Sequence, residues 1–187
     1  MPTFNSIEKT TRDGVITAKV LPGEYYLTKD DEVITTVLGS CIAICIRDIK
    51  TGIGGINHFM YPISTDTVLD DNALPASSFG NYAMECLFND FIAMGGNSEN
   101  LEIKMFGGGK ILSSQAYIGD ENIRFAKQFL LKNKYLITAE DIGGEFSRKL
   151  TYSPKSGKAM IRKLSSTHRQ VIINQENNYH NQICISG

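Results

Sequence analysis

Residues Glu32 to Pro62 read EVITTVLGSCIAICIRDIKTGIGGINHFMYP and contain the clearest strand signals of the chain. Its β-branched and apolar residues from Val33 to Leu38 predict a strand. A Gly-Ser bend interrupts that strand, and a second apolar run from Cys41 to Arg47 predicts the next one. After a turn, Ile53 to Met60 predicts a third short strand. The second and third strands can pair, because only the turn separates them.

Cys41 and His58 are the chain's best candidates for a reactive pair, because pairing of the second and third strands would let them meet. Cys41 follows the Gly39-Ser40 bend, where glycine permits a tight backbone path and the close approach of a substrate. An imidazole within hydrogen-bond reach would take the thiol proton and hold a thiolate, which attacks carbonyl carbon. The alternative is that both residues are structural, as a cysteine on an apolar strand and a histidine beyond a turn usually are.

A third residue orients the histidine in such groups, and no Asp or Glu is obvious nearby. The hydroxyls of Thr35 and Thr36 are the available substitutes. If the strand stays regular through the bend, side-chain alternation puts Thr35 on the face of Cys41 and turns Thr36 away. The sequence therefore predicts Thr35 as the orienting residue.

Three motifs lie around these residues: Pro22-Gly23-Glu24-Tyr25, the run from Thr35 to Cys41, and the run from Gly54 to Met60. They resemble those of the CheD family, the chemoreceptor glutamine deamidases of bacterial chemotaxis. The resemblance places the family's nucleophilic cysteine on Cys41, its histidine on His58 and its threonine on Thr35. Further likenesses to the family are Ile118-Gly119, Asn122, the run from Asp141 to Gly144, and Arg148.

The resemblance covers Leu21 to Leu164 and suggests how the chain is divided. Residues 1–20 would be an N-terminal extension, residues 21–164 the CheD-like deamidase domain, and residues 165–187 a polar, mobile C-terminal tail. For Arg148, we expect a surface position beside a turn, with a buried or substrate-facing ion pair as the alternative.

Composition and charge exclude several classes of function. The 187 residues fit one domain, and 19 Lys and Arg against 20 Asp and Glu give a net charge of −1, so neither nucleic acid nor an anionic membrane is an expected partner. No apolar run is long enough for membrane insertion and no signal peptide is apparent, so we expect a cytoplasmic protein. With four cysteines, three histidines and no CxxC spacing, we expect no metal site and no cofactor.

The rest of the chain predicts helices alternating with strands. The polar stretch from Ile63 to Ser78 is a crossing loop or a lid over the site, and Ser77 or Ser78 would cap a core-facing helix. A strand from Leu101 then ends in a glycine turn, which lacks the spacing of a phosphate-binding loop. We also expect a helix capped by Asp120, a strand from Tyr135 to Asp141, and a hairpin pairing Arg148 to Tyr152 with Ala159 to Leu164.

This order of elements predicts the α/β class, with mixed β-sheets, packed helices and a three-layer, sandwich-like single domain. The family resemblance implies a glutaminase acting on proteins, in which Cys41 would attack side-chain amides in the cytoplasmic helices of chemoreceptors. His58 would protonate the departing ammonia and then activate water to hydrolyse the resulting thioester. The backbone N–H of Cys41, beside the Gly39-Ser40 bend, would stabilise the oxyanion, with the Ser40 hydroxyl as a weaker second donor. Alternatives are a non-catalytic adaptor that binds a chemoreceptor or a CheC-type phosphatase, and a Cys/His amidase or protease with another substrate.

Overall fold

The computed structural model describes residues 7–60, 79–111, 117–165 and 169–185. In chain order, its elements are β1 (Glu8–Arg12), β2 (Val15–Lys19), β3 (Tyr25–Thr28), β4 (Glu32–Leu38), β5 (Ile42–Asp48), β6 (Gly54–Phe59), α1 (Phe79–Ala93), the 3-10 turn η1 (Ser98–Asn100), β7 (Leu101–Gly107), α2 (Tyr117–Lys132), β8 (Ile137–Ile142), β9 (Arg148–Ser153), β10 (Lys158–Lys163) and α3 (Arg169–Ile185).

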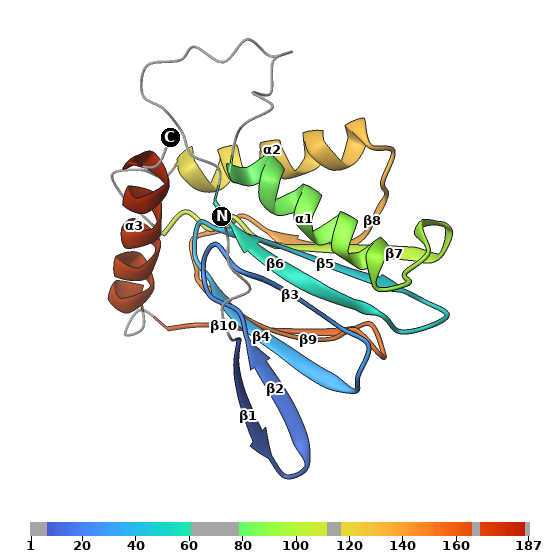
Figure 1. Cartoon of the computed structure of the whole chain (residues 1–187). Coiled ribbons are helices and arrows are strands. Elements are labelled where there is room, and N and C mark those ends of the chain that lie inside the picture. Colours follow the sequence, from blue (N-terminus) through green and yellow to red (C-terminus); the bar gives the residue numbers. More distant parts are fainter. Residues whose placement is uncertain (1–6, 61–78, 112–116, 166–168, 186–187) are drawn as a thin grey trace.

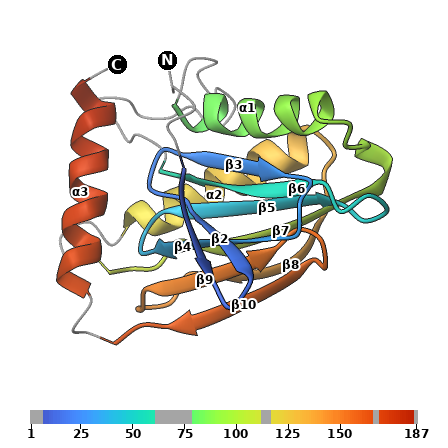
Figure 2. The same ribbon diagram turned by 60° about the horizontal axis from the view of Figure 1, so that its bottom comes forward.

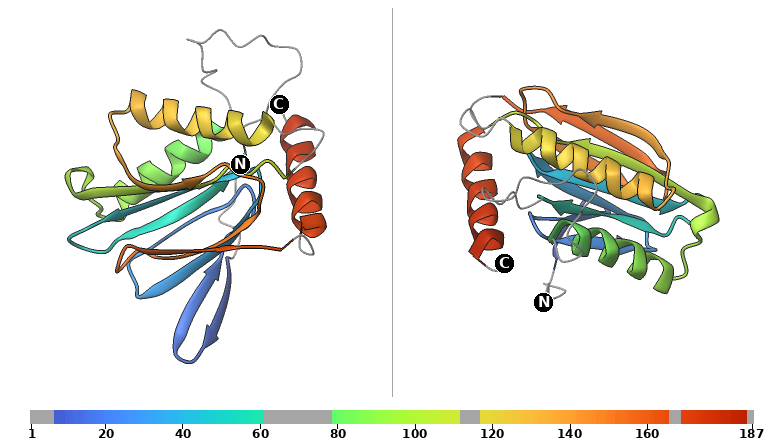
Figure 3. Two further views of the ribbon diagram at one scale, coloured as in Figure 1. Left: turned by 180° about the vertical axis from the view of Figure 1, so that it is seen from behind. Right: turned by 90° about the horizontal axis from the view of Figure 1, so that it is seen from above.

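The strands form two five-stranded sheets. Sheet A has the order β1-β2-β4-β9-β10 and sheet B the order β3-β6-β5-β7-β8. Both sheets are mixed, because β2 pairs parallel with β4 and β7 parallel with β8, whereas the other pairings are antiparallel. Helices α1 and α2 cover the outer face of sheet B, and sheet A covers its inner face (Figures 1 and 3). The predicted three-layer α/β arrangement is confirmed.

Strand β5 lies in the centre of sheet B and is buried on both faces. Ile42, Ile44 and Ile46 belong to the apolar cluster beneath the helices. Ala43 and Cys45 alternate with them and belong to the cluster between the two sheets. An apolar run without polar alternation is what such a strand requires, because neither of its faces meets water.

Most of the predicted elements are confirmed, with small shifts at their ends. Helix α2 begins at Tyr117, so Asp120 lies in its first turn and does not precede it. The predicted lid or loop from Ile63 to Ser78, including the caps Ser77 and Ser78, lies outside the described residues. Within those residues, none of the helices combines the length and apolar character needed to cross a bilayer.

The described residues near both ends of the chain form regular structure. Strands β1 and β2 form a hairpin, and β2 adds to sheet A beside β4. The prediction of a mobile tail after Leu164 was wrong for residues 169–185, which form α3. Figures 1 and 2 show α3 standing across the ends of the strands, apart from α1 and α2 on the sheet face.

Candidate active site

Cys41 lies where the chain crosses from sheet A to sheet B, between β4 and β5. Its side chain is fully buried between the sheets. Gly39 precedes it at a point with no room for a side chain, since a Cβ atom there would lie 2.2 Å from Ile111 Cδ1 and 2.8 Å from Glu176 Oε2. The bend predicted beside Cys41 is thus also a point of close packing.

His58 lies on β6, directly opposite Ala43 in the antiparallel pairing of β5 and β6. This pairing was predicted, and it brings Cys41 and His58 together: the Cys41 Sγ, a ring nitrogen of His58 and a carboxylate oxygen of Glu176 lie within 4.8 Å of one another. His58 is 1% exposed, so the pair is shielded from bulk water.

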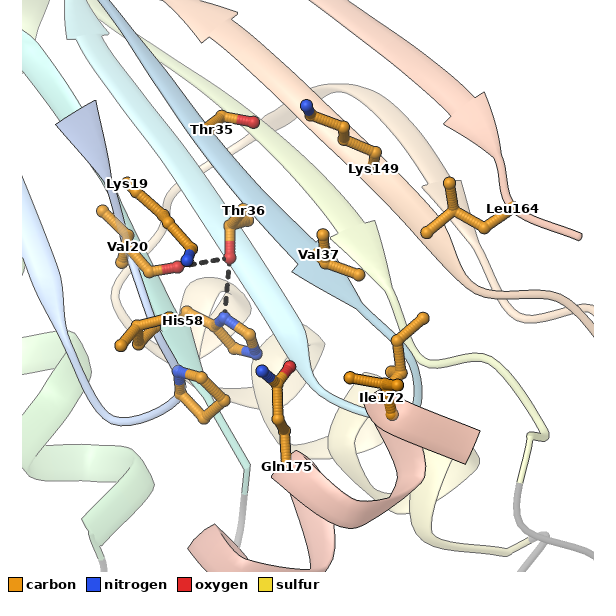
Figure 4. Close-up of a pocket in the computed structure, with 13 residues that line it drawn as sticks. Lys19, Val20, Thr35, Thr36, Val37, His58, Lys149, Leu164, Ile172 and Gln175 are labelled. Atoms are coloured by element: carbon orange, nitrogen blue, oxygen red, sulfur yellow. Dashed lines mark hydrogen bonds between the residues drawn. The ribbon is translucent and has the colours of Figure 1, made fainter. Parts of the chain in front are cut away.

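Thr36 fixes the tautomer of the His58 imidazole. Its Oγ1 lies 2.8 Å from His58 Nδ1 and 2.7 Å from the Val20 carbonyl oxygen (Figure 4). The hydroxyl has one proton, which it donates to the carbonyl, so it must accept from the Nδ1–H of His58. The lone pair of the imidazole is then on Nε2, which has no hydrogen-bond partner among the described residues. The ring nitrogen free to take a proton is therefore Nε2.

The prediction that Thr35 orients the histidine was wrong. The Thr35 hydroxyl donates to the Leu150 carbonyl oxygen at 3.0 Å, and Figure 4 shows it turned away from His58. Alternation was counted through the Gly39-Ser40 bend as if one strand continued, but β4 belongs to sheet A and β5 to sheet B. The face of β4 that meets sheet B carries Thr36.

The glycine turn after β7 supports the loop that carries Cys41. Gly108 N–H donates to the Cys41 carbonyl oxygen at 2.8 Å, and Gly109 N–H donates to that of Gly39 at 2.7 Å. Gly107 has a φ of +113°, and a Cβ atom there would lie 2.1 Å from the Cys41 carbonyl oxygen. From α2, the buried Asn122 donates to the Ser40 carbonyl oxygen at 2.8 Å. Main-chain groups on both sides of the bend are thereby fixed.

Arg148 supports this glycine turn through the segment from Asp141 to Gly143. The prediction of a surface position for Arg148 was wrong. The residue is 1% exposed, and its Nε donates to Asp141 Oδ1 at 2.8 Å. It also donates to the carbonyl oxygen of Gly143, whose own N–H donates to the Gly107 carbonyl oxygen at 2.9 Å. The alternative of a buried arginine in an ion pair is the one observed.

Glu176, from α3, enters the site and receives its hydrogen-bond donors. Oε1 accepts from the backbone N–H groups of Gly39 at 2.8 Å and Cys41 at 3.1 Å. Oε2 accepts from the Ser40 N–H at 2.8 Å and from the Ser40 hydroxyl at 2.6 Å. Cys41, His58 and Glu176 are close enough to hold a metal ion, but these N–H dipoles point their positive ends at the carboxylate. The arrangement favours an anion.

Burial and charge keep the reactive pair uncharged in this arrangement. Burial, followed by the negative charge of Glu176, raises the pKa of the Cys41 thiol well above its ordinary value. Burial lowers the pKa of His58 to about 3. At neutral pH the described site therefore contains a thiol and a neutral imidazole, not a thiolate and an imidazolium.

A pocket of about 310 Å³ lies beside His58, between sheet A and α3 (Figure 4). Its walls include Val20 and Thr36 from the sheet side, and Ile172 and Gln175 from the helix. The pocket reaches the histidine from the side of its Thr36 contact. The imidazole of His58 thus borders a pocket, while α3 covers the thiol of Cys41.

Comparisons with known proteins identify the family of this chain. A family model described as CheD chemotactic sensory transduction matches residues 60–163. A probable chemoreceptor glutamine deamidase CheD of Hahella chejuensis is 40% identical over 185 residues, which cover 98% of this chain and 88% of that protein. The same description belongs to a protein of Hydrogenovibrio crunogenus, 45% identical over 171 residues, covering 91% of this chain and 90% of that one.

This chain belongs to the CheD family. The residues matched by the CheD family model begin at 60, after both Cys41 and His58. The Hahella relative, aligned over 98% of this chain, extends the CheD similarity across the reactive pair.

Sequence reasoning missed three residues that build the site of this CheD protein. Thr36 was rejected on alternation, and Asn122 was noted only as a family likeness. Glu176 was overlooked within a polar stretch. The available signal was its spacing, because Ile172, Glu176 and Tyr179 follow one another at helical intervals of four and three residues.

Proposed function

We propose that this protein is a glutamine deamidase that hydrolyses side-chain amides of chemoreceptors to carboxylates. The observation that carries the proposal is the convergence of Cys41, a ring nitrogen of His58 and the N–H groups of the Gly39-Ser40 bend on one buried point, with His58 Nε2 left without a hydrogen-bond partner among the described residues. The names of the relatives describe the same activity. The cytoplasmic helices of the receptor are the expected substrate.

The reaction begins when His58 Nε2 takes the Cys41 proton and the thiolate attacks the amide carbon of the glutamine. The carbonyl oxygen becomes an oxyanion that accepts from the N–H groups of Gly39 and Cys41, the two donors that share one carboxylate oxygen of Glu176. The imidazolium gives its proton to the amide nitrogen, the C–N bond breaks, and ammonia leaves a thioester behind.

Hydrolysis of the thioester returns the enzyme to its starting state. His58 Nε2 takes a proton from water as the oxygen attacks the thioester carbon, and the C–S bond then breaks. The thiolate regains its proton from the imidazolium, and the product is glutamate. Thr36 keeps the imidazole oriented through a neutral hydrogen bond in both halves of the reaction.

Mass spectrometry of a receptor cytoplasmic fragment tests this proposal. We expect specific glutamines to gain the mass that converts an amide to an acid, with Cys41→Ala inactive in parallel. Cleavage of a peptide bond would indicate the amidase or protease alternative. Binding without any mass change, equal for both forms, would indicate the adaptor, with the receptor or a CheC-type phosphatase as its partner.

A further inference from the structure

Glu176 is an unusual residue to find buried, because a carboxylate leaves water only when its charge is well compensated. It is 1% exposed, although Asn174 and Gln175 beside it on α3 are exposed. Its compensation comes from four donors of the Gly39-Ser40-Cys41 bend, at 2.6 to 3.1 Å. These donors belong to the reaction centre itself.

The position of the carboxylate corresponds to that of a reaction product. Its carbon carries two oxygens, one on the N–H groups of Gly39 and Cys41 and the other on Ser40. A carboxylate oxygen also lies within 4.8 Å of the Cys41 Sγ and a His58 ring nitrogen. Glutamine deamidation leaves a glutamate side chain at this point, and Glu176 has the same side chain.

We propose that α3 is an intramolecular pseudoproduct: a helix of the chain's own that occupies the substrate site, with Glu176 in the place of the deamidated residue, and blocks it until a receptor helix displaces it. This inference rests on the proposed function, because it identifies the occupant of that same site.

The residues through which α3 docks also indicate which substrate helices the site accepts. Ile172 is 4% exposed and packs in the cluster between the sheets, four residues before Glu176. Tyr179 lies three residues after it, half-buried, with its ring 2.5 Å from where a Cβ atom of Gly23 would stand. One helical face thus presents an apolar residue, the reacting position and an aromatic ring. We expect target glutamines on helices with a similar pattern.

The docked helix silences the chemistry for two separate reasons. All the described donors of the bend are used by Glu176, so the oxyanion of another substrate has no place to form. The carboxylate also lies beside the buried thiol, and together with burial it raises the pKa of Cys41. Displacement of α3 removes both obstacles at once.

The first test compares initial rates of receptor deamidation for the full-length protein and for Glu176→Ala. Loss of the charged hydrogen bonds weakens the docking of α3, so we expect a rate about tenfold or more above that of the wild type. The matched control is Asn178→Ala, an exposed position on the same helix, which should leave the rate unchanged.

The second test turns the pseudoproduct into a substrate. In Glu176→Gln the side chain at 176 carries an amide, which Cys41 would hydrolyse with water, releasing ammonia and restoring glutamate. We expect this conversion to be first order and independent of protein concentration, because substrate and nucleophile share one chain. Adding Cys41→Ala to Glu176→Gln should abolish it. The exposed Gln170 and Gln175 are internal controls within the same helix.

The outcomes separate this inference from the proposed function. Faster receptor deamidation by Glu176→Ala, with Cys41-dependent conversion of the glutamine at 176, supports both. Receptor deamidation by the wild type combined with an unchanged rate in Glu176→Ala, or with a stable amide at 176, overturns the pseudoproduct and leaves the deamidase. Absence of deamidation of the receptor and of position 176 in every variant overturns both.

Discussion

At the scale of single residues, the site is controlled by the direction of one hydroxyl proton. Thr36 donates it to the Val20 carbonyl oxygen, and this leaves the hydroxyl oxygen as acceptor for His58 Nδ1. Catalytic histidines are more often oriented by a carboxylate, which also stabilises the imidazolium. A threonine fixes the tautomer without adding charge, which suits a ring buried where charge is costly.

Replacement of Thr36 should therefore lower turnover without abolishing the fold. In Thr36→Val the imidazole loses its acceptor, and we expect kcat to fall about 10- to 100-fold, corresponding to about 1.4 to 2.8 kcal/mol. KM should change little, because Thr36 is a positioning residue. Thr36→Ser should restore most of the rate, and the pH profile of kcat should shift only in the valine variant.

Thr35→Val is the matched control, because it alters the neighbouring residue of the same strand. It removes only the hydrogen bond to the Leu150 carbonyl oxygen. Steady-state kinetics should give a kcat close to that of the wild type. A loss in Thr35→Val as large as in Thr36→Val would contradict the assignment of the orienting role to Thr36.

The buried imidazole should also make stability depend on pH. Its pKa is about 3 in the folded protein against 6.5 ordinarily, so between these values the unfolded chain binds the extra proton. The contribution of the neutral His58 to the free energy of unfolding is fully present above pH 6.5. It is lost as pH falls toward 3, at up to about 1.4 kcal/mol per pH unit. Urea unfolding of the wild type and His58→Gln at several pH values measures it. Parallel pH dependences in the two proteins would contradict it.

At the scale of elements, the glycine turn after β7 carries the Cys41 loop. Gly107→Ala would put a methyl group 2.1 Å from the Cys41 carbonyl oxygen at a φ of +113°. We expect a loss of about 2 to 4 kcal/mol in the free energy of unfolding, from strain and collision together, and a lower kcat. Denaturant unfolding and kinetics check both.

Gly14→Ala separates backbone strain from collision. Gly14 has a φ of +76° in the turn between β1 and β2, and nothing lies within 4 Å of its Cβ position. We expect a loss of about 1 kcal/mol and an unchanged kcat, since only strain is introduced. If Gly14→Ala and Gly107→Ala lose equal free energy of unfolding, the collision with the Cys41 carbonyl oxygen adds little to the cost of Gly107→Ala.

The strands were predictable because their signals are local, whereas the site depends on how the sheets are placed. The apolar run of β5 predicted a strand, and its pairing with β6 predicted the meeting of Cys41 and His58. The choice of Thr36 over Thr35 depends on β4 and β5 lying in different sheets, which no periodicity records. Arg148 was misplaced for a related reason: its partner carbonyls belong to turns that are folded against it.

At the scale of the whole molecule, α3 is attached differently from the rest of the fold. It was missed as an element because its residues are polar and Asn-rich, and its hold on the body comes from a few side chains such as Ile172 and Glu176. Strand β5, by contrast, is paired on both sides and buried on both faces. By our proposal, the molecule combines a cooperative body with a helix that leaves it when a receptor binds.

Hydrogen exchange measured by mass spectrometry should distinguish the two parts. We expect amides of α3 to exchange through a local opening, at rates well above those of β5, which open only on global unfolding. Glu176→Ala should speed exchange in α3 and leave β5 unchanged, and Asn178→Ala should alter neither. Exchange of α3 and β5 at one common rate would show that the helix is part of the cooperative body.

The complete burial of Cys41 has a consequence for the protein's lifetime under oxidative stress. Peroxides and alkylating agents attack accessible thiolates, and a resting thiol that is 0% exposed with a raised pKa is a poor target for either. Sulfinic and sulfonic acids would accumulate on Cys41 only in molecules engaged with a receptor or carrying Glu176→Ala, as adduct masses after peroxide treatment would reveal. The resting protein thus protects Cys41 from oxidation, and oxidative damage is limited to molecules that are bound to a receptor.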